Sequence, residues 1–138
     1  MAAVGRNLEP VVKDVTNMKM IAAAAVAILA ISAGSAKAAD AEAGAKVFKA
    51  QCTACHTIVP HKKLIGPSLF GVVGRKSGQE DFAYSDANKN SGLTWDEATL
   101  DKYLTSPKTV VPGTKMTYAG LKNDTQRADL IAYLATVK

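Results

Sequence analysis

The chain has 138 residues, a formal net charge of +5 and 48% hydrophobic residues. This length suits one compact domain with a modest core. The sequence has no basic run interleaved with aromatic side chains, which argues against nucleic-acid binding.

Residues 1–38 have the character of an N-terminal leader. A short basic segment begins at Met18, an alanine-rich apolar run extends from Ile21 to about Ala33, and Ala36-Lys37-Ala38 supplies small residues at the cleavage positions. This layout predicts a secretory signal peptide, Met18–Ala38, cut after Ala38. The apolar run is shorter than the roughly 20 residues that span a bilayer, so we expect no stable membrane insertion. An uncleaved anchor is the alternative, and Met18 is a better candidate than Met1 for the translation start.

Cleavage leaves residues 39–138, a domain of 100 residues that carries 13 basic and 10 acidic side chains and a net charge of +3. So short a chain has little core of its own, and a buried prosthetic group would supply apolar surface. We expect this domain in the periplasm, an oxidising compartment in which paired thiols are normally consumed.

The domain begins with a helix that ends at two cysteines. Asp40 is placed to cap a helix extending to about Gln51. Cys52-Thr53-Ala54-Cys55-His56 follows, and the chain has no other cysteine. Cysteines at this spacing on a helical turn share one face, where both thiols can add to one porphyrin and the adjacent imidazole can bind its iron. The motif predicts one covalently attached haem c with its iron.

Three other interpretations of this motif are weaker. A thioredoxin-like redox disulfide belongs near parallel-strand signals, which the sequence lacks here. A zinc site usually takes four ligands, whereas His61 is the only other thiol or imidazole in the chain. A structural disulfide between Cys52 and Cys55 would constrain almost nothing.

The rest of the domain predicts an all-α fold with long loops. From Val59 to Ser91 the chain is rich in glycine and lacks a regular pattern, which suits a segment wrapped around a prosthetic group. Thr94-Trp95-Asp96-Glu97 predicts a capping box that opens a second helix, which Pro107 ends. A last helix begins near residues 123–125 and has apolar residues at helical spacing: Leu130, Ile131, Leu134 and Val137.

Met116 is the only methionine of the domain, in a loop that begins Val111-Pro112-Gly113. A thioether favours ferrous iron and raises the reduction potential, so the haem motif makes Met116 the expected second axial ligand. Without that motif, a lone methionine would be interpreted as a core residue. His61 is the rival ligand, but it lies five residues after His56 on the segment that leaves it. We expect His61 to make a local hydrogen bond in the loop or to lie on the surface.

From about Ala41 to the end, the chain resembles a class I cytochrome c, in the branch shared by mitochondrial cytochrome c and its soluble bacterial relatives. The matching segments cover nearly all of the domain in order: Cys52–His56, Gly66-Pro67 and residues 74–78, 84–90, 93–95, 112–116 and 130–134. The resemblance implies a small cytochrome c fold, in which helices and long loops surround one covalently attached haem.

The resemblance also implies roles for further residues. His56 and Met116 would ligate the iron, and the other ring nitrogen of His56 would donate to the Pro67 carbonyl. Three residues resemble the hydrogen-bonding groups around the buried propionates: Arg75, Tyr84 and Trp95. Three others resemble the internal polar network on the methionine side: Asn88, Tyr103 and Thr114. Ordinary core aromatics at Trp95 and Tyr103 and a surface charge at Arg75 are the alternative. The first helix would cross the last, with Gly44 and Phe48 against Leu130 and Tyr133.

In the family, lysines surround the exposed haem edge at positions that match Lys108, Lys115 and Lys122, and Lys62 and Lys63 extend this set. Such a patch steers encounters with acidic partner surfaces and weakens as salt rises. Scattered solvating lysines are the alternative. The sequence departs from the family at Gln51, where many relatives have lysine, and across residues 58–65, which do not align cleanly.

These features predict a soluble, monomeric, periplasmic carrier of single electrons that is not an enzyme and has no catalytic residues. By resemblance, its donor is a quinol-oxidising cytochrome bc complex and its acceptor a terminal oxidase or a photosynthetic reaction centre. A haem enzyme would need a labile or missing Met116 and a distal acid–base residue, which the sequence does not offer. A dedicated electron donor to one periplasmic enzyme is the remaining alternative.

Overall fold

The computed structural model describes residues 38–138. The signal peptide lies outside these residues except for Ala38, as does the choice between Met1 and Met18. The cleavage site and the domain boundary at residue 39 therefore stay predictions.

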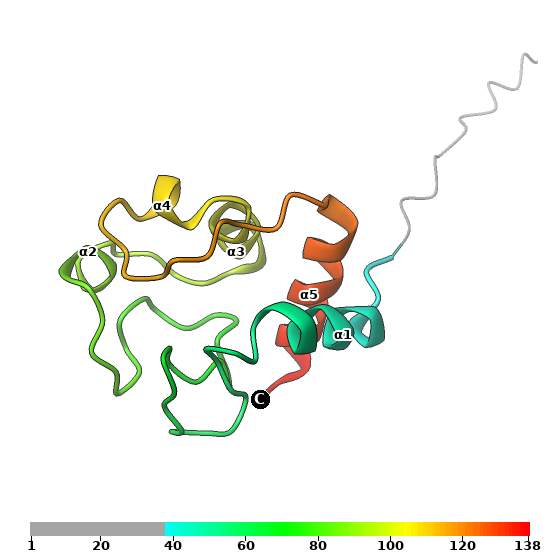
Figure 1. The fold of residues 1–138 in the computed structure, drawn as a ribbon, viewed down its shortest axis with the longest axis horizontal. Helices are drawn as coiled ribbons and strands as arrows, with labels where there is room; N and C mark the ends of the chain where they lie inside the picture. Colours follow the sequence, from blue (N-terminus) through cyan, green and yellow to red (C-terminus); the bar gives the residue numbers. More distant parts are fainter. Residues whose placement is uncertain (1–37) are drawn as a thin grey trace, which may run out of the picture. The chain divides into compact units, whose positions relative to one another are not determined.

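Five helices make up the regular structure of this part: α1 (Ala41–Gln51), α2 (Asp86–Lys89), α3 (Glu97–Thr105), α4 (Pro107–Val110) and α5 (Asp124–Thr136) (Figure 1). Residues 38–138 contain no strand, only an isolated bridge between Lys76 and Thr94. The all-α prediction is confirmed. None of the helices described is both long enough and apolar enough to cross a bilayer.

The first and last helices begin where the sequence predicted. The Asp40 carboxylate accepts hydrogen bonds from the amides of Glu42 and Ala43, at 2.9 and 3.1 Å, and so caps α1. Asn123 caps α5 in the same way, with its side-chain oxygen 2.9 Å from the Gln126 amide nitrogen.

The predicted capping box is wrong in position. Asp96, not Thr94, caps α3, since its carboxylate lies 2.7 Å from the Thr99 amide nitrogen. The backbone of Thr94 instead pairs with that of Lys76 in the isolated bridge, so Thr94 lies outside the helix. Pro107 ends α3 as predicted, and it also begins α4 because a first helical position needs no N–H.

The structure also differs from the sequence-based prediction at α2, a short helix inside the segment from Val59 to Ser91 that was predicted to be a loop. The Ser85 hydroxyl accepts from the Asn88 amide at 3.1 Å and caps this single turn. A helix of four residues leaves no apolar periodicity, so sequence patterns do not detect it.

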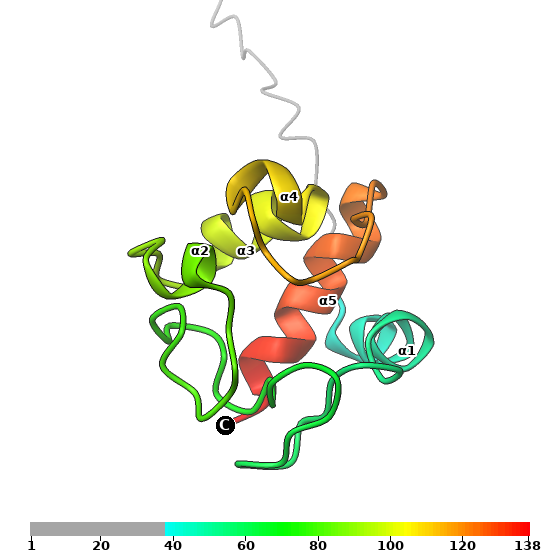
Figure 2. The same ribbon diagram turned by 60° about the vertical axis from the view of Figure 1, so that its left-hand side comes forward.

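Helix α1 crosses α5, and the two pack closely (Figures 1 and 2). A Cβ atom at Gly44 would lie 1.9 Å from the Asp129 carbonyl oxygen, so only glycine permits this approach. The rings of Phe48 and Tyr133 are 5.5 Å apart at the same crossing, and Leu130 beneath them is 1% exposed. The predicted contact between the first and last helices is confirmed.

Arg127 joins α5 to the opposite half of the domain. Its side chain is 8% exposed, with Nε 2.6 Å from a carboxylate oxygen of Asp101 in α3. Its other nitrogens donate to the Leu121 carbonyl and to Asp124, both at 2.9 Å. All three nitrogens of the buried guanidinium group therefore have hydrogen-bond partners, as burial of a charge requires. These contacts fix α5 against α3 and against the loop that precedes α5.

Candidate haem site

A cavity lies between the helices and the loops, and its lining residues extend from Gln51 to Leu134. All eleven predicted cofactor-binding residues line it: Cys52, Cys55, His56, Pro67, Arg75, Tyr84, Asn88, Trp95, Tyr103, Thr114 and Met116. Much of the remaining wall is apolar, with Leu69, Val72, Leu100, Leu104, Leu130 and Leu134. A cavity that combines an apolar wall with polar side chains suits a ligand with an apolar body and polar substituents.

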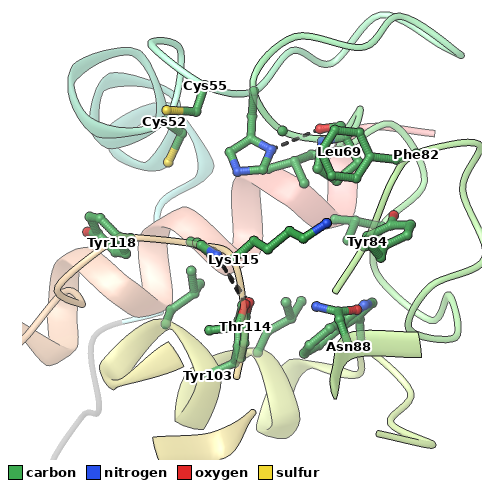
Figure 3. Close-up of a pocket in the computed structure, with 18 of the residues that line it drawn as sticks. Cys52, Cys55, Leu69, Phe82, Tyr84, Asn88, Tyr103, Thr114, Lys115 and Tyr118 are labelled. Atoms are coloured by element: carbon green, nitrogen blue, oxygen red, sulfur yellow. Dashed lines mark hydrogen bonds between the residues drawn. The ribbon is translucent and has the colours of Figure 1, made fainter. Parts of the chain in front are cut away.

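The two cysteines lie together on one side of this cavity (Figure 3). The Cys55 amide donates to the Cys52 carbonyl at 3.1 Å, and the His56 amide donates to the same carbonyl at 2.8 Å. This turn directs three reactive side chains to one region. Both cysteine side chains are half-buried. Before attachment of a cofactor, burial, with a smaller contribution from Cys55, raises the pKa of the Cys52 thiol to about 11.

The imidazole of His56 is held from two directions. Its Nδ1 lies 2.8 Å from the Pro67 carbonyl oxygen, and because a carbonyl only accepts, Nδ1 must carry the proton. Burial lowers the pKa of His56, so the ring is neutral and Nε2 keeps its lone pair. A Cβ atom at Gly66 would lie 2.4 Å from the ring, so this glycine forms the surface on which the imidazole rests. His56 is thus oriented as a neutral nitrogen ligand.

Met116 belongs to the other side of the cavity. The Tyr103 hydroxyl lies 3.4 Å from its sulfur and 3.3 Å from the Thr114 hydroxyl oxygen. Burial raises the pKa of Tyr103, which keeps its phenol protonated as a donor. Figure 3 shows Tyr103 and Thr114 opposite Cys52 and Cys55. The sulfur is therefore positioned across the cavity from the histidine.

Arg75 is a partly buried cation that lines the cavity. Its side chain is only 16% exposed, and it donates to the carbonyls of Phe70 and Ser68, at 2.9 and 3.0 Å. Its Nη1 also lies 2.9 Å from a Glu80 carboxylate oxygen. The alternative that Arg75 is a surface charge is therefore wrong. Burial raises the pKa of Tyr84, and the charge of Arg75 acts in the opposite direction.

Two predicted residues differ from the others. Asn88 lines the cavity, but its side-chain oxygen accepts from Ser77 rather than from the Tyr103–Thr114 pair. His61 is not among the lining residues, and its side chain is 89% exposed with Nδ1 3.5 Å from a Glu80 oxygen. The surface position and local contact predicted for His61 match this geometry, and its role as an iron ligand does not.

Sequence reasoning missed several residues of the site. Tyr118 and Phe82 line the cavity, and Glu80 pairs with Arg75 beside it. Tyr118 could have been found from its place two residues after Met116. Glu80 and Phe82 lie in an irregular loop, where no periodicity indicates which side chains turn inward.

The lysines of the predicted docking patch are exposed, but several of them already make hydrogen bonds or an ion pair within the protein. Lys115 lines the cavity rim and donates to the Ala83 carbonyl at 3.2 Å, while Lys122 donates to the Thr105 carbonyl at 2.5 Å. Lys63 lies 2.6 Å from an Asp81 carboxylate oxygen. Lys108 is exposed on α4. The charges remain at the surface, so a docking role stays a prediction.

Residues 41–138 match the sequence profile of the family described as Cytochrome c. The chain belongs to the cytochrome c family. Cytochrome c2 of Rhodoblastus acidophilus is 59% identical over 103 residues, which cover 73% of this chain and 95% of that protein. Cytochrome c2 of Rhodomicrobium vannielii is 57% identical over 122 residues, 86% of this chain and 97% of that protein.

Among solved structures, cytochrome cH from Methylobacterium extorquens is 48% identical, with a TM-score of 0.66 over 70% of this chain and 98% of that structure. The resemblance noted from the sequence and the cytochrome c fold are both confirmed. Family membership implies electron transport by one covalently attached haem c with its iron, and Cys52, Cys55 and His56 have the required spacing.

Proposed function

We propose that this protein is an exported carrier of single electrons whose haem c is attached to Cys52 and Cys55 and ligated by His56 and Met116. The observation that supports this most directly is the arrangement of the two ligands around one cavity. His56 presents an unprotonated nitrogen beside the cysteines, and the Met116 sulfur lies on the far side with Tyr103. A site with two protein ligands suits electron transfer, because neither ligand need leave when the oxidation state changes.

The residues that line the cavity fit a haem group, and each has a separate role. The haem supplies the one-electron chemistry when bound. The Pro67 carbonyl orients His56, and Tyr103 orients the Met116 sulfur. The leucine-rich wall excludes water, and Arg75 is a cation in the lining that could meet the haem propionate groups.

The partners follow from the family resemblance. We propose a quinol-oxidising cytochrome bc complex as donor and a terminal oxidase or photosynthetic reaction centre as acceptor. The exposed Lys108, with Lys115 and Lys122, would meet acidic partner surfaces in a small and short-lived complex. The relatives named cytochrome c2 and the signal-peptide pattern support a periplasmic, monomeric carrier without enzymatic activity.

Optical spectra of the purified ferric protein test the proposal. We expect a low-spin spectrum with a sulfur-to-iron charge-transfer band, and Met116→Ala should abolish that band. A high-spin spectrum in the unaltered protein would contradict the proposal and favour a haem enzyme with an open distal position.

A further inference from the structure

One side-chain hydrogen bond joins the two ligand-bearing segments across the cavity rim. The Tyr118 hydroxyl donates to the side-chain oxygen of Gln51. Gln51 is the last residue of α1 and directly precedes Cys52, whereas Tyr118 lies two residues after Met116. Both residues line the cavity, and Figure 3 shows the Tyr118 ring on the side where Cys52 lies.

The backbone around Tyr118 has few other restraints. Within residues 38–138, the amides of residues 117–120 donate no hydrogen bond to another backbone group. The next backbone anchor is the Leu121 amide, 2.7 Å from the Leu104 carbonyl oxygen. On the other side, the Met116 amide donates to the Thr114 side chain at 3.2 Å. Gly120 packs closely against α3, since a Cβ atom there would lie 2.1 Å from the Thr105 carbonyl oxygen. Residues 117–119 are therefore the part of the segment that depends on side chains for its position.

The chemistry of the two side chains fixes the direction of this hydrogen bond. The Tyr118 hydroxyl is the donor, because an amide oxygen can only accept. Gln51 stays neutral at every pH and accepts through its amide oxygen. Because the cysteine side is anchored by backbone bonds, the contact restrains the methionine segment rather than the reverse.

We propose that Tyr118 and Gln51 are positioning residues that hold the Met116 segment closed and so limit exchange of the sixth ligand. The inference rests on Met116 ligation in the proposed function. Opening of residues 117–119 breaks this hydrogen bond and lets Met116 move away, which exposes the site to a competing ligand. A net hydrogen bond is worth enough to change such an opening equilibrium about 2- to 10-fold.

The experiment is a titration of the ferric holoprotein with imidazole at pH 7, followed by loss of the sulfur-to-iron band. Imidazole is used because much of it is uncharged at this pH, which limits the effect of surface charge. Tyr118→Phe keeps the ring and removes only the donor, and we expect imidazole to bind it about 2- to 10-fold more tightly. Gln51→Leu removes the acceptor and should have the same effect. The double variant should equal either single variant, because both remove one bond.

Two further variants give the test its controls. Gln51→Glu retains an acceptor oxygen and should return the imidazole affinity toward that of the unaltered protein. Tyr133→Phe removes a hydroxyl from the α1–α5 crossing, outside the cavity lining, and should leave the affinity unchanged. Equal affinity in Tyr118→Phe and the unaltered protein, or full additivity of the two single variants, would overturn the inference alone. Absence of the band in the unaltered protein would overturn the proposed function as well.

Discussion

The two sides of the cavity are held by different kinds of interaction. On the histidine side, backbone groups bond to backbone groups: Gly66 donates to Cys55 and Leu69 to Thr57, both at 2.8 Å. On the methionine side, the sulfur and its segment depend on hydroxyl groups of Tyr103 and Thr114. Backbone bonds survive most substitutions, whereas a hydroxyl is lost with a single atom. The histidine side is therefore the fixed half of the site, and the methionine side is the adjustable half.

The largest expected effect tests the fixed half. Replacing Cys52 and Cys55 with alanine removes both thiols, so acidified organic solvent should extract the haem completely. The unaltered protein should retain its haem under the same treatment, as measured by haem staining of a denaturing gel. Thr53→Ala, inside the same motif, is the control and should retain it as well. Covalently retained haem in the double variant would contradict attachment through these residues.

The sequence was informative about the fixed half because its residues are adjacent in the chain. Cys52, Cys55 and His56 form one motif whose spacing alone predicts the chemistry. Helices α1 and α5 were also predictable, since their caps and apolar spacing are local signals.

The adjustable half depends on contacts between distant residues, which spacing does not reveal. Nothing local to Tyr118 indicates that its partner is Gln51, 67 positions away. The role of Glu80 beside Arg75 likewise depends on how an irregular loop turns. The resemblance to a family provided Tyr103 and Thr114, but not the hydrogen bonds that connect them.

A methyl group at Gly66 should disturb the fixed half directly. In Gly66→Ala the added carbon would lie 2.4 Å from the His56 ring, so the imidazole or the backbone must shift. Overpacking of this kind costs about 1–3 kcal/mol in the free energy of unfolding. Urea denaturation of the ferric holoprotein measures this loss, and the ferric spectrum should change with it.

Gly92→Ala is the control that separates the effect of a steric contact from that of backbone strain. Gly92 has a φ of 66°, and a Cβ atom there would meet nothing within 4 Å. We expect a loss of roughly 1 kcal/mol from the left-handed backbone and no change in the ferric spectrum. If Gly66→Ala also left the spectrum unchanged, His56 would not depend on the surface that Gly66 provides.

Charge reversal compares the two sides as docking surfaces. Lys108→Glu with Lys115→Glu should slow reduction by a physiological partner about tenfold at low salt, because both charges are exposed and steer the encounter. The difference should vanish at high salt. Lys62→Glu with Lys63→Glu makes the same change in charge on the histidine side, outside the proposed patch of Lys108, Lys115 and Lys122. We expect a smaller effect there, and equal slowing at every ionic strength would argue against electrostatic steering.

The smallest effect concerns a single hydroxyl on the adjustable half. The Tyr103 hydroxyl donates to the Met116 sulfur and so withdraws electron density from it. Ferric iron needs a stronger donor than ferrous iron, so this hydrogen bond favours the reduced state. Tyr103→Phe should therefore lower the reduction potential, on the order of 20–50 mV for part of one hydrogen bond. Spectroelectrochemical titration measures the shift, with Tyr133→Phe as the control outside the cavity lining. A constant potential in Tyr103→Phe would show that the hydroxyl does not act on the sulfur, and a rise would show that the hydroxyl favours the oxidised state, so either result would contradict the proposed effect.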